Sequence, residues 1–263
     1  MTKYVPKTQP IIKKSTIELR IPNKDKETGF IYPFEYGDYL EVGKKILSQG
    51  MEVSTGDEIA SLLHHSYFYE FKYFPEYADE EKVIKEVISN DGFWVYNLNI
   101  LTDKGIFVCK DLNALGEYKK LNIKKLEEKI LMKNQAKEID GVRFSEDGLV
   151  RFAPKGSYFF YIYNRQGSDR THSIEELSED GFILASFGKK GRKQLTEISS
   201  ELKEYSEIFG PEEYIEERNL PIQGVSWICF WDGVLKFQGF HNLEKYSGYK
   251  AEENSGVEVK KEK

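Results

Sequence analysis

The sequence predicts an α+β domain with a mainly antiparallel, mixed sheet built from hairpins, an N-terminal helical block and one long helix packed on the sheet. Three observations carry this prediction. Pairs of apolar segments are joined by short turns, amphipathic patterns cluster in the first third of the chain, and residues 194–209 form a longer amphipathic pattern. Hairpins join antiparallel strands, and an amphipathic helix buries its apolar face against another layer.

Length and composition favour one large domain. The protein has 263 residues, of which 14% are aromatic, and such a chain can bury a substantial core. We expect a flexible N-terminal arm over residues 1–14 and a single domain over 15–249, with a candidate boundary near 111–122. Residues 250–263 are charged and poor in apolar side chains, so we expect a disordered tail there.

The first predicted elements are a strand and an aromatic segment. Residues 16–21 alternate between apolar and polar side chains, as a strand with one buried face does. Residues 30–36 are aromatic but contain Pro33. Because proline cannot donate to a sheet, we expect an edge strand or an ordered loop at this point.

Three helices are predicted next. Residues 38–48 have apolar side chains at helical spacing, and Gly50 provides a stop. A second helix begins after Thr55, because Glu58 stands three residues further on and completes a capping-box pattern. A third helix is expected over about 79–89 from its apolar stripe.

Strands dominate the rest of the chain. Cys109 and Cys229 both fall in predicted strands and are expected to be buried, reduced thiols, although a disulfide stays open until the strand order is known. The predicted hairpins join 93–101 to 106–110, 142–144 to 149–152, and 225–230 to 234–237; further elements are helices over 121–132 and 173–177 and a strand over 158–163.

The segment 182–209 organises the predicted fold. Residues 182–187 are an almost unbroken apolar run, which is typical of a strand covered on both faces. Residues 188–193 contain two glycines and four cations and are expected to form a basic loop. An amphipathic helix should then run from about 195 to 209 and stop at Gly210.

The charges of this segment oppose the helix dipole. Cations precede or occupy the first turn of the predicted helix, although a helix N-terminus prefers anions. A bound anion would explain this arrangement; the alternatives are a solvated basic loop or pairing with the chain's own acidic segment 212–217. The order of residues does not match a P-loop. The candidate anion-binding residues are Lys189, Lys190, Arg192, Lys193, Arg165 and Arg170, with His172 beside them.

Residues 67–77 form an unusually aromatic run with seven aromatic side chains. Such a run can form a stacking platform or a surface that binds a partner. The alternative is that it seals the helical block against the sheet. The candidate partner-binding residues are Tyr67, Tyr69, Tyr73, Phe74 and Tyr77.

The sequence contains no convincing catalytic or metal-binding pattern. The four histidines and two cysteines lack the spacing of a zinc site, so neither a metal nor a cofactor is expected. No nucleophile elbow is present, and the 44 acidic residues make any choice of a catalytic pair arbitrary. Whether the protein is an enzyme stays open.

The function predicted from these observations is that of a non-catalytic binding or assembly protein with an unknown partner. The alternative is a nucleotide- or nucleic-acid-associated protein that binds phosphate at 188–193. A net charge of −6 argues against a general nucleic-acid coat, so any such contact would be local. The N-terminal residues are polar and no apolar run could span a bilayer, so we expect no membrane association and a cytoplasmic location.

Overall fold

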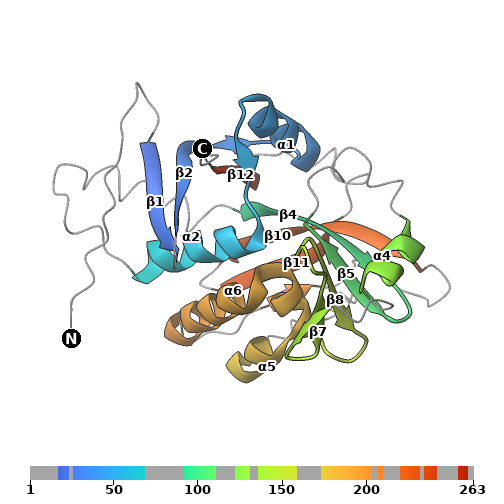
Figure 1. The fold of residues 1–263 in the computed structure, drawn as a ribbon. Coiled ribbons are helices and arrows are strands. Elements are labelled where there is room, and N and C mark those ends of the chain that lie inside the picture. Colours follow the sequence, from blue (N-terminus) through green and yellow to red (C-terminus); the bar gives the residue numbers. More distant parts are fainter. Residues whose placement is uncertain are drawn as a thin grey trace, which may run out of the picture.

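The protein is an α+β fold in which helices cover both faces of a large, mainly antiparallel sheet (Figure 1). We analysed a computed structural model. It describes residues 17–23, 26–68, 92–110, 122–130, 136–158, 173–202, 207–209, 220–231, 234–241 and 254–259.

The strands join into one continuous sheet. Its main path runs β1-β2-β12-β4-β5-β8-β7-β6, while β10 pairs with both β4 and β11. Among the pairs in the described residues, β12 with β4 and β11 with β9 are parallel and the rest are antiparallel. The strands are β1 (Ile17–Asn23), β2 (Lys26–Tyr36), β3 (Glu52–Val53), β4 (Gly92–Leu101), β5 (Gly105–Cys109), β6 (Lys137–Ile139), β7 (Val142–Phe144), β8 (Val150–Pro154), β9 (Glu207–Phe209), β10 (Ile222–Trp231), β11 (Val234–His241) and β12 (Asn254–Val259).

All three predicted hairpins are confirmed. β4 pairs with β5, β7 with β8, and β10 with β11, each antiparallel. The predicted helices over 38–48, 121–132 and 173–177 are also present, as is the helix after Thr55. The described helices are α1 (Tyr39–Ser48), α2 (Gly56–Phe68), α4 (Ile123–Ile130), α5 (Ile174–Glu179) and α6 (Gly181–Leu202).

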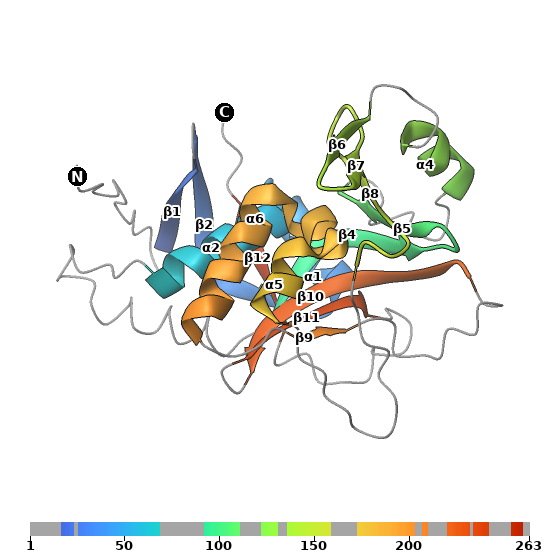
Figure 2. The ribbon, with the colours of Figure 1, turned by 90° about the horizontal axis from the view of Figure 1, so that it is seen from below.

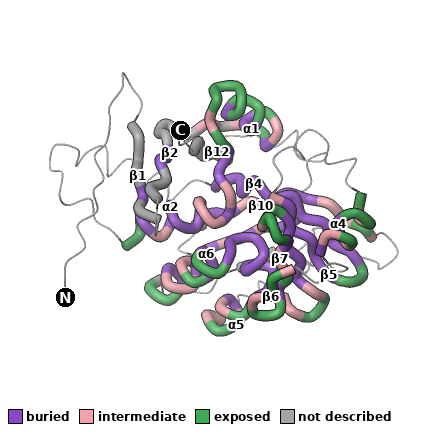
Figure 3. Tube along the Cα trace, viewed as in Figure 1, coloured by how far each residue is buried: buried purple, intermediate pink, exposed green. Residues whose placement is uncertain are grey.

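Two hydrophobic clusters fill the space on the two faces of the sheet. Alternate residues of β4 point to opposite faces, so Phe93 and Val95 join the cluster beneath α2 and α6, whereas Trp94 and Tyr96 join the cluster beneath α1 and α4. Figure 2 shows α2, α5 and α6 together on one side of β4 and β10, and Figure 3 shows that β4 and the facing side of α6 are buried. Because both faces of the sheet are covered, all ten residues of β4 are buried, including Asn97 and Asn99.

The long helix on the sheet is confirmed, but the predicted strand and loop that precede it are wrong. Residues 182–187 are helical, and α6 runs from Gly181 to Leu202 with a non-helical residue at Gly188. Residues 181–188 are all buried, and a fully buried helix is as uniformly apolar as a buried strand. The carboxylate of Asp180 accepts a hydrogen bond from the Ile183 backbone N–H at 2.8 Å and caps the helix start.

The far end of the predicted helix is also different. Residues 207–209 are not helical; they form β9, which pairs in parallel with β11. This short strand places the chain along the sheet after α6 ends. The predicted continuous helix from 195 to 209 is therefore correct over its first half.

Two predictions about strands need correction. Pro33 lies in β2, which is not an edge strand, because β1 and β12 flank it. The proline is accommodated on the β12 side because the pairing there is interrupted between Ile31 and Glu35. The tail expected to be disordered contains β12, which pairs with three other strands.

The other predictions concern the two cysteines, membrane-spanning helices and three further segments of the chain. Cys109 and Cys229 are both buried thiols, as expected. None of the helices in the described part of the chain has the length and apolarity that crossing a membrane requires. The predicted arm 1–14, the helix over 79–89 and nearly all of the candidate boundary at 111–122 lie outside the described residues.

Candidate functional site

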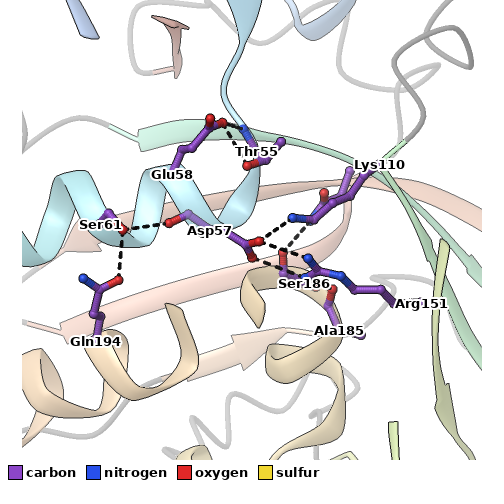
Figure 4. A network of polar contacts seen from close by, with 10 residues as sticks. Thr55, Asp57, Glu58, Ser61, Lys110, Arg151, Ala185, Ser186 and Gln194 are labelled. Carbon is purple, nitrogen blue, oxygen red and sulfur yellow. Dashed lines mark hydrogen bonds and ion pairs between the residues drawn. The ribbon is translucent and has the colours of Figure 1, made fainter. Parts of the chain in front are cut away.

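Three charged side chains meet beside the point where α6 is interrupted (Figure 4). Asp57 lies in the first turn of α2, Lys110 directly follows β5, and Arg151 belongs to β8. Lys110 donates to Asp57 Oδ2 at 2.8 Å, and Arg151 donates to both carboxylate oxygens, at 3.0 Å and 3.3 Å. We call Asp57, Lys110 and Arg151 the polar centre.

The start of α2 holds Asp57 in place. The carboxylate of Glu58 accepts hydrogen bonds from the backbone N–H and the hydroxyl of Thr55, at 2.7 Å and 2.9 Å. The backbone half of the predicted capping box is therefore present, but the Thr55 hydroxyl donates to Glu58, and the Glu58 N–H bonds to the Thr55 carbonyl instead. Asp57 therefore occupies a first-turn position, where the positive end of the helix dipole favours a carboxylate.

The interruption of α6 supplies the other side of the polar centre. Arg151 donates through Nη1 to the Ala185 carbonyl at 3.0 Å, and Asn97 donates to the Ser186 carbonyl at 3.0 Å. These carbonyls belong to the last turn before the break, where the helix C-terminus favours a cation and side-chain donors. The break is therefore stabilised by polar groups from β4 and β8.

Gly188 provides the backbone geometry of the break. Its φ of 68° and ψ of 173° fall in a region that is essentially restricted to glycine. A side chain at this position would begin 2.7 Å from Asp57 Oδ1. The carboxylate thus lies against the residue that starts the second half of α6.

Burial is unequal within the polar centre. The side chains of Lys110 and Arg151 are only 9% and 8% exposed, whereas Asp57 keeps 41% of its side-chain surface exposed. Solvent and solutes can therefore reach the carboxylate, behind which lie two nearly buried cations. The three side chains together carry a net charge of +1, and the carboxylate is their most exposed group.

The ionisation of the centre follows from these contacts. Burial raises the pKa of Asp57, but the charges and hydrogen bonds of Lys110 and Arg151 outweigh it and hold that pKa below its usual value. Burial lowers the pKa of Lys110. The negative charge of Asp57 acts in the opposite direction, but repulsion from Arg151 lowers the pKa further, and the net change is a decrease. Burial raises the pKa of Glu58 despite its hydrogen bonds from Thr55.

Buried polar atoms with unused hydrogen-bonding capacity lie at the polar centre and the break. Eight buried side-chain atoms in the described part of the chain have no hydrogen-bond partner, and three of them belong to residues of the centre or of the break: Asn97 Oδ1, Ser186 Oγ and Arg151 Nε. Such atoms are uncommon in folded proteins, since each costs roughly 1–3 kcal/mol when left unpaired. Both donors and acceptors are therefore available close to the break in α6.

Close packing of α2 against α6 fixes the centre. A side chain at Gly56 would begin 2.2 Å from the Ser186 carbonyl oxygen, and one at Gly191 would begin 3.1 Å from the Cβ of Ala60. Further along the same contact, Ser61 donates to Gln194 at 3.1 Å. The two helices can approach this closely because glycine occupies their contact points.

The basic residues predicted to bind an anion do not form a loop. Lys189, Lys190 and Lys193 are exposed on the second half of α6, and Lys193 lies 3.5 Å from Glu197 one turn later. Arg192 is buried instead and forms an ion pair with Asp140 of the β6–β7 turn. The acidic segment 212–217, like Arg165, Arg170 and His172, lies outside the described residues.

The aromatic run is described only at its start. Tyr67 and Phe68 at the end of α2 are 43% and 37% exposed, and their rings lie 5.2 Å apart. Tyr69, Tyr73, Phe74 and Tyr77 lie outside the described residues. The structure therefore supports an exposed aromatic pair at this end of α2.

The sequence predictions missed all three members of the polar centre. Arg151 did carry a signal, because it is a charge between two apolar residues of a predicted strand and a buried charge needs a partner. Asp57 and Lys110 carried none, since their contact joins residues 53 positions apart. Nothing in the sequence pattern places these two positions together.

Comparisons with protein-family models, curated proteins and solved structures found no match to this chain. Among the residues that the structure describes, no group of three or more histidine, cysteine or acidic side chains could hold a metal ion.

Proposed function

We propose that this protein is a non-catalytic binding protein and that its polar centre binds a small anionic group, with phosphate as the model ligand. One observation carries the proposal: two cations that are less than a tenth exposed share a single carboxylate that is 41% exposed. The three groups carry a net charge of +1, so an anion beside Asp57 is attracted by two cations and repelled by one carboxylate, with which it competes for their hydrogen bonds. Charge-assisted hydrogen bonds of this kind are about twice as strong as neutral ones.

Several features support an anion over a cation at this point. The N-terminus of α2 and the second half of α6 both begin beside the carboxylate, and helix N-termini attract negative charge. Lys189, next in the chain to Gly188, is exposed. The anion that the sequence predicted at 188–193 is thus proposed to lie at the polar centre, beside Asp57. A nucleotide would be one source of the phosphate.

Inorganic phosphate should raise the melting temperature of the protein at constant ionic strength. A ligand present at a hundred times its Kd stabilises the folded state by about 2.7 kcal/mol. Replacing Lys110 or Arg151 with methionine should weaken this effect because each change removes one charged donor. The measurement is thermal unfolding followed by circular dichroism over a phosphate titration, with chloride as the ionic-strength control.

Lys104→Met is the matched control for these variants. Lys104 is 53% exposed and pairs with Glu127 at 2.6 Å, away from the polar centre. It should keep the full response to phosphate. No response in the wild type, or an undiminished response in both the Lys110 and Arg151 variants, would remove the proposed anion site.

A protein partner is the second candidate, and the exposed pair Tyr67 and Phe68 favours it. Two adjacent, partly exposed aromatic rings are typical of surfaces that bind other proteins. In this alternative the aromatic residues further along the run would extend the surface. A cytoplasmic location remains a prediction under either function.

If the partner is a second copy of this chain, replacing both Tyr67 and Phe68 with serine should abolish its self-association while leaving the fold intact. Because both side chains are more than a third exposed, the free energy of unfolding should change by no more than about 1 kcal/mol. Light scattering over a range of protein concentrations would measure the association. The control changes Leu47 and Leu149, which are 38% and 40% exposed, to serine. An equal loss of association in the control, or a wild type that never associates, contradicts self-association through the aromatic pair.

A further inference from the structure

The last described strand occupies an internal position in the sheet. β12 lies between β2 and β4, although it follows them in the chain by more than 150 residues. In Figure 1 it is the dark red strand beside the blue β2. Within the described sheet, β1 and β2 reach β4 only through β12, and β3 pairs with β12.

The pairing of β12 is extensive on one side and short on the other. It is antiparallel to β2 through four residue pairs, from Ser255 with Tyr36 to Val259 with Phe30, with a register shift after Gly256. It is parallel to β4 through two pairs, at Asn254 and Ser255. Two further pairs join Glu258 and Val259 to β3. The strand is therefore held by backbone pairing on both of its edges.

The sequence of β12 is mostly polar. Its sequence, from Asn254 to Val259, contains only Val257 and Val259 as apolar branched residues. Recognition by strand addition has the same character, since main-chain hydrogen bonds provide the affinity and alternate side chains provide selectivity. The space between β2 and β4 thus has the properties of a site that accepts an extended peptide.

We propose that β2, β3 and β4 form a strand-acceptor site and that β12 of a second copy of this chain can occupy it in place of the chain's own strand. A second copy carries the same segment, so every residue pair with β2, β3 and β4 is reproduced in the exchanged form. Exchange of an identical element makes no new kind of contact, which is why it is a low-cost route to dimers. The site is distinct from the polar centre.

The test uses the full chain and a synthetic peptide. A protease site is placed within residues 242–253, the folded protein is cut, and a fluorescent peptide of residues 250–263 is added. Fluorescence anisotropy should show one peptide bound per chain as the cut tail is released. A peptide with proline in place of Glu258 should not bind, because proline removes a donor from the paired strand and cannot sit in the middle of a sheet.

The second arm tests the second copy directly. Full-length chains labelled with donor and acceptor dyes, mixed at high concentration, should develop energy transfer that excess 250–263 peptide abolishes and the proline peptide does not. If the cut protein unfolds, the native peptide should restore its circular dichroism spectrum. Failure of the peptide to bind or to restore structure, or energy transfer that the peptide leaves unchanged, overturns the proposal.

Discussion

Replacing Gly188 with alanine should lower the free energy of unfolding by about 2–4 kcal/mol. A φ of 68° with a ψ of 173° is inaccessible to alanine without strain, and the new methyl group would begin 2.7 Å from Asp57 Oδ1. The chain must therefore either shift the carboxylate away from Lys110 and Arg151 or distort the break in α6. Denaturant unfolding at neutral pH measures the loss.

Gly148→Ala is the matched control. Gly148 has a φ of 69°, nearly the same as Gly188, but a side chain there would meet no atom within 4 Å. It should lose only about 1–2 kcal/mol, which is the cost of a left-handed conformation for an alanine. Equal losses at the two positions would mean that the contact with Asp57 contributes nothing.

A double-mutant cycle separates the two costs at Gly188. In the Asp57→Ala background the carboxylate is absent, so the steric part of the Gly188→Ala loss should disappear and the dihedral part should remain. The two changes should therefore be less than additive, because the residues are in contact. Strict additivity would show that the break in α6 and the polar centre are independent.

The elements that could be predicted are those in which local pattern and tertiary position agree. The hairpins were predictable because short turns force neighbouring strands to pair. The starts of α2 and α5 were predictable because capping contacts are local, as the hydrogen bonds between Ser173 and Glu176 confirm. These features depend on residues only a few positions apart.

Residues 182–187 could not be assigned from their apolarity, because complete burial removes the periodicity that separates a strand from a helix. The useful signal was Asp180, whose side chain caps the following turn. The strand β12 was not predicted, for the opposite reason. Its polar composition is compatible with disorder, and its order depends on backbone pairing with strands that lie far away in the sequence.

The contacts within the polar centre could not be predicted from the sequence. Its members come from α2, β8 and the residue after β5, and only the sheet order brings them together. The basic cluster at 189–193 was visible because it is contiguous, yet the structure divides it between solvent and an ion pair with Asp140. Contiguous charge was therefore a weaker guide here than one charge in a buried strand.

Replacing Asp57 with asparagine should lower the free energy of unfolding by about 2–3 kcal/mol at neutral pH. Removing one partner from a buried ion pair costs about 3–5 kcal/mol, and the 41% exposure of Asp57 reduces that figure. Lys110 and Arg151 would keep their burial but lose their counter-charge. Denaturant unfolding of the variant beside the wild type measures the difference.

The difference should depend on pH in a defined direction. The pKa of Asp57 is lower in the folded state than the ordinary value of 3.8, so its carboxylate stabilises the fold above that ordinary value. This contribution disappears as the pH falls below about 4 and through the folded-state pKa. The wild type and Asp57→Asn should therefore converge in stability at low pH and differ most above about pH 5. A constant difference across this range would contradict the ion pairing.

Asp57→Ala distinguishes an anion-binding centre from a purely structural ion cluster. The change removes the carboxylate that competes for Lys110 and Arg151 and leaves space beside Gly188. If the centre binds anions, phosphate should stabilise this variant more than the wild type, because the external anion takes over the role of the missing carboxylate. The same titration on Asp57→Ala combined with Lys110→Met should give a smaller response, since one of the two donors is gone. If the cations serve only to hold α2 against β8 and α6, the variant will lose stability and phosphate will restore none of it.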